Sequence, residues 1–427
     1  MRGKGLVAAL AACALLLPQA AGARDAKLAL DTARIDRTLK SFVASGRAVG
    51  ASVLVWKDGH EAHFDAEGEA DREAGRAFAR DTQVQAFSMT KPVTGVALMQ
   101  LWEQGKFGLD DPLSRYLPQF AGVKVFDGTN PDGSIRLRAP RRAITIRDIM
   151  RHTAGLTYGD GGDPGAYGDA GKAVTAIWNK LEPLSPDHTL AQYADILPQV
   201  PLLWDPGTHW HYSTGADLQA RLVEVLSGQP FDEYVAQHIF GPLGMMHSCW
   251  KCPAAMLPRL AQIYTPARGG QLEPIARDEW LKHNFMGKPM TEGGAGLVTT
   301  VDDYMRFARM LLGQGELEGV RILRPSTVRL MSTDQLDPRI TERQWLPSKG
   351  SGGFGLDFFV RTSAPRSPEE NRGAVGEFFW DGFPSMLFWV DPANDMEVVF
   401  ATQKEPFDAT LHRDIREAVY GPDGTGR

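Results

Sequence analysis

Cysteine is scarce in this chain, with 3 residues in 427. Cys13 lies in the first apolar stretch, which leaves Cys249 and Cys252 as a Cys-x-x-Cys pair. A zinc site would need two further ligands nearby, and a thioredoxin-like redox site would need a βαβ setting, whereas this pair follows a turn rich in glycine and proline. We interpret the pair as a small local disulfide or an idle pair, and its spacing alone does not separate the two.

An excess of basic charge and long apolar runs are also missing. The formal charge is -6 and the pI is near 6.0, which excludes the basic stripe expected of a nucleic-acid partner. The longest apolar stretch, residues 5–17, is too short to span a bilayer comfortably, so we expect no transmembrane segment in the mature chain. A hydrophobic fraction of 43% and a charged fraction of 23% indicate an ordinary globular protein.

Residues 1–23 have the order of a secretory signal. Arg2 and Lys4 precede the apolar stretch, and a small-residue segment ends at Ala23, where cleavage is favoured. This predicts an exported protein, periplasmic or secreted. A lipoprotein box ending at Cys13 is an alternative, although residues 14–17 stay apolar where a lipoprotein usually turns polar. A buried N-terminal helix is the other alternative.

The two ends of the mature chain carry the signals of one sheet. Residues 27–47 have one-faced helical spacing, and two strands, 51–56 and 60–67, flank an Asp-Gly turn. Further strands are expected at 378–380, 385–391 and 396–402, with a closing helix at 409–420. Hairpin spacing at both termini predicts an α/β fold, with an antiparallel sheet built from both termini and flanked by helices.

The middle of the chain reads differently, being rich in proline, glycine and aspartate. Helical patches occur at 216–226 and 231–240, whereas residues 159–171 hold six glycines in thirteen positions and predict a mobile loop near the site. We therefore assign three parts to the chain. They are a signal peptide at 1–23, a sheet domain at 24–110 and 295–427, and a mostly helical domain at 111–294.

The most informative segment is residues 87–95, which read FSMTKPVTG. Apolar residues keep helical spacing downstream as far as Gly105, and Pro92 is tolerated only in the first turn of a helix, so the helix begins close to Ser88. Three residues apart on a helix, Ser88 and Lys91 share one face. A neutral lysine can then act as the base that makes the serine a nucleophile, provided that burial lowers its pKa. As a four-residue pattern, Ser-x-x-Lys also arises by chance at exposed helix starts.

Other segments supply the context. Residues 209–215 (HWHYSTG) place Tyr212 on a loop before a helix, where its hydroxyl can relay a proton to a leaving group. Trp380, Asp381 and Gly382 end a C-terminal strand, where backbone N–H groups could complete an oxyanion hole. Residues 150–156 (MRHTAGL) and 293–300 (GGAGLVTT) are turns punctuated by glycine.

In this order and spacing, the motifs resemble the serine β-lactamase-like hydrolases: class C β-lactamases, D-Ala-D-Ala peptidases and family VIII esterases. The resemblance covers nearly the whole mature chain. It implies an α/β domain formed by both termini, a helical insert, and a covalent acyl intermediate on Ser88. It also implies that the backbone N–H groups of Ser88 and Phe383 form the oxyanion hole.

Two departures from the family pattern bear on the substrate. Thr214 occupies the place of the asparagine in the usual Tyr-x-Asn loop and cannot offer both an amide donor and an acceptor. Trp380 stands where β-lactamases have the lysine of Lys-Thr-Gly, and a tryptophan there is typical of the esterase branch. Asp381 beside the site would disfavour an anionic substrate, unless it faces solvent.

Histidines and further tryptophans are secondary candidates. His209 and His211 lack a carboxylate partner and are interpreted as loop structure, and His152 as holding a turn, so we expect no metal and no cofactor. Four tryptophans could line an acyl pocket or simply pack in the interior: Trp178, Trp204, Trp210 and Trp250.

The sequence thus predicts a serine hydrolase that cleaves a small-molecule carboxylic ester through Ser88, Lys91 and Tyr212. The first alternative is the same site acting on β-lactams or peptidoglycan-type D-amino-acid peptides. The second is a non-catalytic sensing module that retains the fold. Acyl and leaving-group specificity, and water or another nucleophile as acceptor, stay open.

Overall fold

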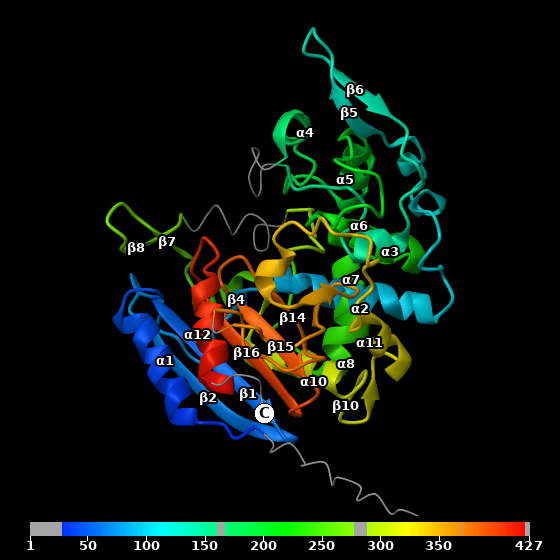
Figure 1. Cartoon of the computed structure of the whole chain (residues 1–427). Coiled ribbons are helices and arrows are strands. Elements are labelled where there is room, and N and C mark those ends of the chain that lie inside the picture. Colours follow the sequence, from blue (N-terminus) through cyan, green and yellow to red (C-terminus); the bar gives the residue numbers. More distant parts are fainter. Residues whose placement is uncertain (1–27, 160–166, 277–287, 368, 423–427) are drawn as a thin grey trace, which may run out of the picture.

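The computed structural model describes residues 28–159, 167–276, 288–367 and 369–422 (Figure 1). The predicted signal peptide and the lipoprotein alternative at Cys13 lie outside these residues. Among the described residues, no helix is both long and apolar enough to cross a membrane.

An antiparallel sheet of eight strands forms the centre of the fold, in the order β12-β13-β14-β15-β16-β1-β2-β3. The N-terminal strands are β1 (Gly50–Lys57), β2 (His60–Asp71) and β3 (Arg76–Ala77). The C-terminal strands are β12 (Gly352–Phe354), β13 (Phe359–Arg361), β14 (Phe378–Asp381), β15 (Leu387–Asp391) and β16 (Met396–Thr402). Strand β1 pairs with β16, with Val53 opposite Phe400, so both termini build one sheet, and the predicted fold class is confirmed.

The turn between β1 and β2 follows from its two residues. Asp58 and Gly59 have φ angles of 52° and 78°, the left-handed pair that a two-residue hairpin requires. Their conformation matches the twist of the flanking strands, which is why the hairpin could be located from the Asp-Gly signal.

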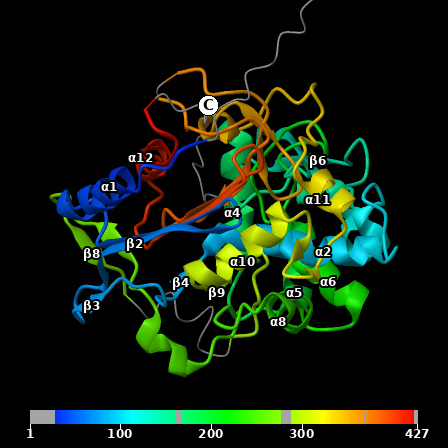
Figure 2. The ribbon, with the colours of Figure 1, turned by 90° about the horizontal axis from the view of Figure 1, so that it is seen from below.

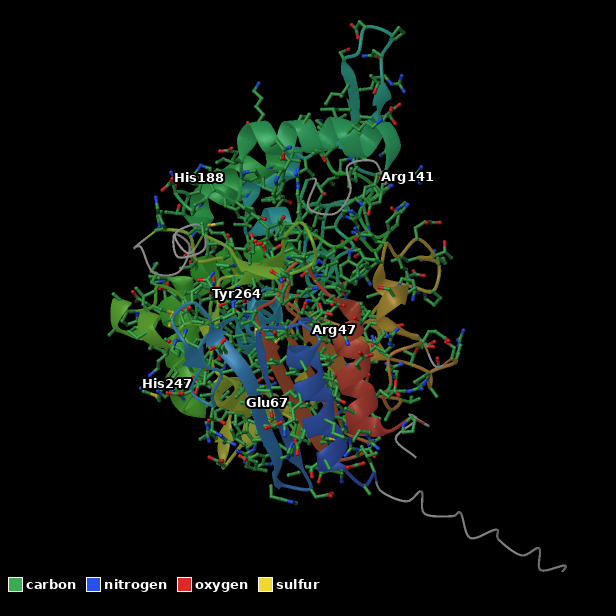
Figure 3. All side chains as sticks on the ribbon, turned by 90° about the vertical axis from the view of Figure 1, so that its left-hand side faces the viewer. Arg47, Glu67, Arg141, His188, His247 and Tyr264 are labelled. Atoms are coloured by element: carbon green, nitrogen blue, oxygen red, sulfur yellow. A yellow bond between two sulfur atoms is a disulfide. The ribbon has the colours of Figure 1, made fainter. Side chains whose placement is uncertain are left out.

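Two helices from opposite ends of the chain cover one face of the sheet. They are α1 (Thr32–Ala44) and α12 (Ala409–Tyr420), which pack against each other. Figure 3 shows Arg47 just beyond α1, where its guanidinium lies 2.7 Å from the Asp414 carboxylate of α12. Helix α12 has the predicted bounds. Helix α1 is shorter than the predicted 27–47, because the Asp31 side chain caps it by accepting from the Arg34 N–H.

The opposite face is covered by α10 (Val301–Leu312), which packs on β1, β15 and β16 (Figure 2). Beside it lie α2 (Thr90–Glu103) and α11 (Pro325–Met331). The first ten residues of α2, Thr90 to Met99, are all buried, because this helix also packs against α6 (Gly215–Ser227). The side chains in the first turns of α2, including that of Lys91, are therefore shielded from water.

Residues 111–294 contribute the remaining helices, together with two hairpins. The helices are α3 (Ile146–Met150), α4 (Gly168–Leu181), α5 (Leu190–Ile196), α6, α7 (Phe231–Val235) and α8 (Gly241–Leu243). The hairpins are β5 (Val125–Thr129) with β6 (Ile135–Arg138), which projects from the body in Figure 1, and β7 (Tyr264–Pro266) with β8 (Leu272–Pro274).

The predicted loop at 159–171 is wrong at its end. Helix α4 begins at Gly168 and includes Gly171, which is buried, so packing overrides the poor helix propensity of glycine there. Residues 160–166 of that prediction lie outside the described residues. The predicted helix at 231–240 is present as α7 followed by a π turn, Ala236–Phe240.

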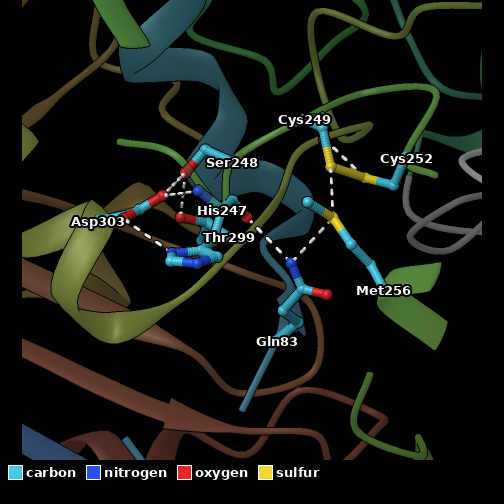
Figure 4. The surroundings of a disulfide bond; sticks show 8 residues. All are labelled: Gln83, His247, Ser248, Cys249, Cys252, Met256, Thr299 and Asp303. Carbon is cyan, nitrogen blue, oxygen red and sulfur yellow. Dashed lines mark hydrogen bonds and ion pairs between the residues drawn. A yellow bond between two sulfur atoms is a disulfide. The ribbon is translucent and has the colours of Figure 1, made fainter. Parts of the chain in front are cut away.

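Cys249 and Cys252 form a disulfide (Figure 4). The backbone of Cys249 exchanges two hydrogen bonds with Val298 of β9 (Val298–Thr299). Strand β9 pairs in turn with β4 (Val84–Gln85), the strand that leads directly to Ser88. The disulfide loop thus supports the backbone that carries the candidate nucleophile.

Candidate active site

Ser88 lies in a single 3₁₀ turn, Phe87–Met89, between β4 and α2. Phe87 has a φ of 45°, a left-handed conformation that costs a non-glycine residue energy and is often held at functional sites. Helix α2 starts at Thr90 with Pro92 in its first turn, and Gly105 follows its end with a φ of 72°. The predicted start and end of this helix are both confirmed.

The side chains of Ser88 and Lys91 meet. Lys91 Nζ lies 3.1 Å from Ser88 Oγ and donates a second hydrogen bond of 2.9 Å to the carbonyl oxygen of Gly294. Lys91 is only 1% exposed. An ammonium in this position would be poorly solvated, which favours the neutral amine.

Burial lowers the pKa of Lys91 to about 8, while carboxylates around it, first Asp217 and then Asp357, oppose that shift. The backbone of Gly294 connects Lys91 with Asp217 through two hydrogen bonds. Its N–H donates to Asp217 Oδ1 at 2.9 Å, and its carbonyl accepts from Lys91. Burial also raises the pKa of the Asp217 carboxyl, to about 7. Lys91 and the buried Asp217 thus both make hydrogen bonds to the backbone of Gly294.

Tyr212 lies on the loop before α6, and Lys91 Nζ sits 4.6 Å from the centre of its ring. Its hydroxyl is buried and makes no hydrogen bond within the described part of the chain. Burial raises the pKa of this phenol, and its polar neighbours, the Ser88 hydroxyl and the Trp380 indole, act in the opposite direction. The phenol therefore stays protonated over the working pH range.

His152 supports the tyrosine loop. It has a φ of 56°, and its backbone carbonyl accepts from the His211 N–H at 2.9 Å. Its ring lies 4.8 Å from that of Tyr212, and Nδ1 is 3.1 Å from Ser213 Oγ. The predicted turn at His152 is present, and it also positions the neighbouring loop.

The end of β14 approaches the turn that carries Ser88. A Cβ on Gly382 would lie 2.4 Å from the carbonyl oxygen of Ala86, so only glycine fits this contact. Among the described residues, no protein acceptor receives the backbone N–H of Ser88 or of Phe383. Two backbone donors without a protein acceptor in the described part of the chain thus lie within two residues of this close contact, and an oxyanion hole requires donors of this kind.

A pocket of about 420 Å³ opens beside these groups. It is lined by Ser88, Tyr212, Trp345, Ser348, Lys349, Asp381, Phe383, Phe407 and Ala409. The four tryptophans that could line an acyl pocket or pack in the interior are not among them, and one of these, Trp178, is buried. Trp210 and Trp250 are packed in the interior, while Trp204 stacks on His209 with ring centres 4.5 Å apart.

Asp381 does not face solvent, so that alternative is wrong. It is 6% exposed, and its Oδ2 accepts from Lys349 Nζ. Lys349 comes from a separate turn, Leu346–Lys349, that no sequence motif marked. Trp380 lies behind the pocket wall, with its ring 5.6 Å from that of Tyr212.

Thr214 is fully buried, and its hydroxyl has no partner among the described residues. Its backbone carbonyl accepts from the Tyr193 hydroxyl at 3.0 Å. Lys91 makes its second hydrogen bond to the Gly294 carbonyl. The Nδ1–H of His211 donates to the Leu156 carbonyl at 2.9 Å, in keeping with a structural role in the loop.

Sequence analysis missed Lys349, Asp217 and the part played by Gly294. Gly294 stood within a motif that had been recognised only as a turn. Asp217 follows Tyr212 by five residues on α6 and could have been noticed as an acid in the first turn of a predicted helix. Lys349 had no signal, since only the tertiary fold brings its turn to β14.

The family model named Beta-lactamase matches residues 35–420. Protein Rv1367c of Mycobacterium tuberculosis is 32% identical over 394 residues, covering 90% of this chain and 92% of its own. Esterase EstB of Burkholderia gladioli is 27% identical over 407 residues, which cover 91% of this chain and 95% of EstB. The solved structure of EstCE1, a hydrolase with promiscuous acyltransferase activity, has a TM-score of 0.74 at 27% identity. The match covers 91% of this chain and 98% of EstCE1.

These matches extend over the sheet, the helices and the site alike, and they support a serine-hydrolase-type activity. The predicted resemblance is confirmed: this chain belongs to the Beta-lactamase family.

Proposed function

We propose that this protein is an exported serine hydrolase that cleaves carboxylic esters through an acyl-Ser88 intermediate, with Lys91 as the base and Tyr212 as the proton relay. The observation that carries the proposal is the 3.1 Å contact between Lys91 Nζ and Ser88 Oγ, made by an amine whose pKa is lowered to about 8. A lysine that loses its proton so readily can accept the serine proton near neutral pH.

The reaction proceeds in two halves. Neutral Lys91 takes the proton from Ser88 Oγ as that oxygen attacks the ester carbonyl, and the backbone N–H groups of Ser88 and Phe383 stabilise the oxyanion. Tyr212 gives its proton to the leaving alcohol oxygen and is reprotonated from Lys91. Water then attacks the acyl carbonyl. Its proton passes through Tyr212 and Lys91 back to Ser88 Oγ, and the acid is released.

Ester cleavage is favoured over β-lactam or D-amino-acid peptide cleavage for two reasons. The strand position that holds a lysine in β-lactamases holds Trp380 here, and the nearby cation of Lys349 is already paired with Asp381. Among the similar proteins, EstB is named an esterase and EstCE1 a hydrolase.

Acyl transfer to an alcohol is a second candidate, because EstCE1 is described as a hydrolase that also has promiscuous acyltransferase activity. The same acyl-Ser88 intermediate serves both reactions. Product analysis in water with added short alcohols separates them, since transfer yields a new ester and hydrolysis only the acid.

Export is supported by the leader-like residues 1–23 and by the Cys249–Cys252 disulfide, which suits an oxidising compartment. Expression from the complete sequence followed by N-terminal sequencing of the mature protein tests this. We expect the mature chain to begin at Arg24; an acylated Cys13 would instead support lipoprotein anchoring.

The decisive experiment compares the wild type with Ser88→Ala on short 4-nitrophenyl esters. We expect hydrolysis by the wild type, loss of at least about a thousandfold in Ser88→Ala, and an acyl adduct on Ser88 by intact mass. Ser41→Ala, on the exposed side of α1, is the matched control and should keep full activity.

Two results would favour the alternatives. Nitrocefin turnover comparable to ester turnover would support a β-lactamase. A folded protein that neither hydrolyses acyl substrates nor reacts with a fluorophosphonate probe would support the non-catalytic module.

A further inference from the structure

An ion pair is enclosed in the wall of the pocket beside the nucleophile. Lys349 and Asp381 are each 6% exposed, and Lys349 Nζ donates to Asp381 Oδ2. The ammonium also lies 4.3 Å from the ring centre of Phe407 and 5.2 Å from that of Trp345. Both charges are thus held in place in the wall of the pocket that Ser88 also lines.

The wall carries no net charge. Lys349 and Asp381 are the only charged side chains among the described residues that line the pocket. Behind them, His412 Nδ1 lies 3.9 Å from Asp381 Oδ2, and burial lowers the pKa of His412 to about 4, so its ring is neutral at pH 7. The remaining lining is largely aromatic, with Trp345, Phe383 and Phe407.

We propose that Asp381 is a specificity-determining residue that masks the Lys349 cation, so that this pocket takes an uncharged ester. The proposal rests on the esterase function proposed above. A substrate carboxylate near Lys349 would have to compete with a carboxylate that is already bound and desolvated. An uncharged alkyl or aryl group instead packs on the aromatic side chains at no electrostatic cost.

The same geometry makes Lys349 a latent anion site. If the charge of Asp381 is removed, one unpaired cation remains in an enclosed site close to Ser88, where its attraction for an anion exceeds that in water. Preference for anionic substrates should therefore follow the sum of the two charges. Asp381→Asn leaves a net positive wall, Lys349→Met a net negative one, and the double variant a neutral one like the wild type.

The test measures kcat/KM for 4-nitrophenyl hydrogen adipate and for its methyl ester, which differ only in the distal charge. A second pair, 4-acetoxybenzoate and its methyl ester, places the charge on the leaving group. In Asp381→Asn we expect the ratio of anionic to neutral substrate to rise by about tenfold or more in at least one pair, mainly through KM. In Lys349→Met the ratio should fall, and in the double variant it should return to near the wild-type value.

The neutral ester is the internal reference, because Asp381 also raises the pKa of Lys91 and its loss affects both substrates alike. A merely structural role would lower both rates and leave the ratio unchanged, and that result in both pairs overturns the proposal. So does a double variant that keeps the ratio of Asp381→Asn. If Asp381→Asn does not fold, the fall of the ratio in Lys349→Met decides.

Failure of the underlying function is distinguishable from failure of this inference. A wild type that hydrolyses neither member of a pair and leaves Ser88 unlabelled by a fluorophosphonate removes both. A wild type that is labelled and active, but whose variants keep one substrate ratio, removes the masking role alone.

Discussion

The pH dependence of ester hydrolysis should report the proton on Lys91. With a pKa of about 8, roughly a tenth of the amine is neutral at pH 7 and roughly half at pH 8. Because only the neutral amine can accept the serine proton, kcat/KM should rise with pH, with a midpoint near 8, and level off above about pH 9.

Asp217→Asn should move that midpoint to lower pH. The Asp217 carboxylate raises the pKa of Lys91, and it acts from the other side of the Gly294 peptide backbone. Removing a unit charge that lies one residue's backbone away from the amine lowers the pKa of the amine by roughly one unit. Asparagine keeps an oxygen that can accept from the Gly294 N–H, so the loop retains its anchor.

The assay is a kcat/KM profile from pH 6 to pH 10 with a 4-nitrophenyl ester. The absorbance at each pH is corrected for the fraction of 4-nitrophenol that is ionised. Glu397→Gln is the matched control, because Glu397 is also a buried carboxyl and does not act on Lys91. The reasoning is refuted if the wild type shows no acidic limb between about pH 7 and 9. It is also refuted if Asp217→Asn leaves the midpoint unchanged or raises it.

Two further substitutions test the oxyanion contact and the buried charges. Gly382→Ala would force a Cβ to within 2.4 Å of the Ala86 carbonyl, so we expect kcat to fall by about a hundredfold and the protein to lose about 1–3 kcal/mol of stability, whereas Gly122→Ala, which faces open space, should keep wild-type kinetics and stability. Glu377→Gln would remove the carboxylate shared by two fully buried arginines, Arg361 on β13, which keeps only Glu370 at 3.6 Å, and Arg416 on α12. We therefore expect unfolding in urea to show a loss of about 3 kcal/mol, and unchanged stability would contradict this.

The parts of the fold that sequence analysis predicted are those set by local chemistry. The β1–β2 hairpin was marked by Asp58 and Gly59, whose left-handed conformations few other pairs adopt. Helix α12 was marked by its apolar spacing, and the start of α2 by Pro92. The Ser88–Lys91 contact could be foreseen because it lies within one helical turn.

What could not be predicted depends on contacts between distant segments. Lys349 reaches Asp381 across 32 positions of the chain, and nothing near either residue indicates the other. Asp381 was therefore left between two interpretations, neither of which included a partner. Gly168 and Gly171 were predicted to lie in a loop because glycine has a low helix propensity. In the structure they belong to α4, because tertiary packing outweighs that propensity.

The glycines at 293–296 bring a backbone hydrogen-bond acceptor to the buried amine of Lys91. A Cβ at Gly293 would lie 2.4 Å from the Ala216 carbonyl of α6, and one at Gly296 would lie 2.6 Å from the Trp250 ring, so only a bare backbone fits close to both. That closeness places the Gly294 carbonyl 2.9 Å from Lys91 Nζ.

Helix α2 holds the same loop through its own side chains. Thr94 Oγ1 donates to the Gly293 carbonyl at 2.7 Å, and Thr90 Oγ1 accepts from the Leu297 N–H at 3.1 Å. Lys91 therefore donates its second hydrogen bond to backbone that is held in place by neighbours on its own helix. Because Lys91 already donates to this backbone carbonyl, its contact with Ser88 is kept with threonine at position 214.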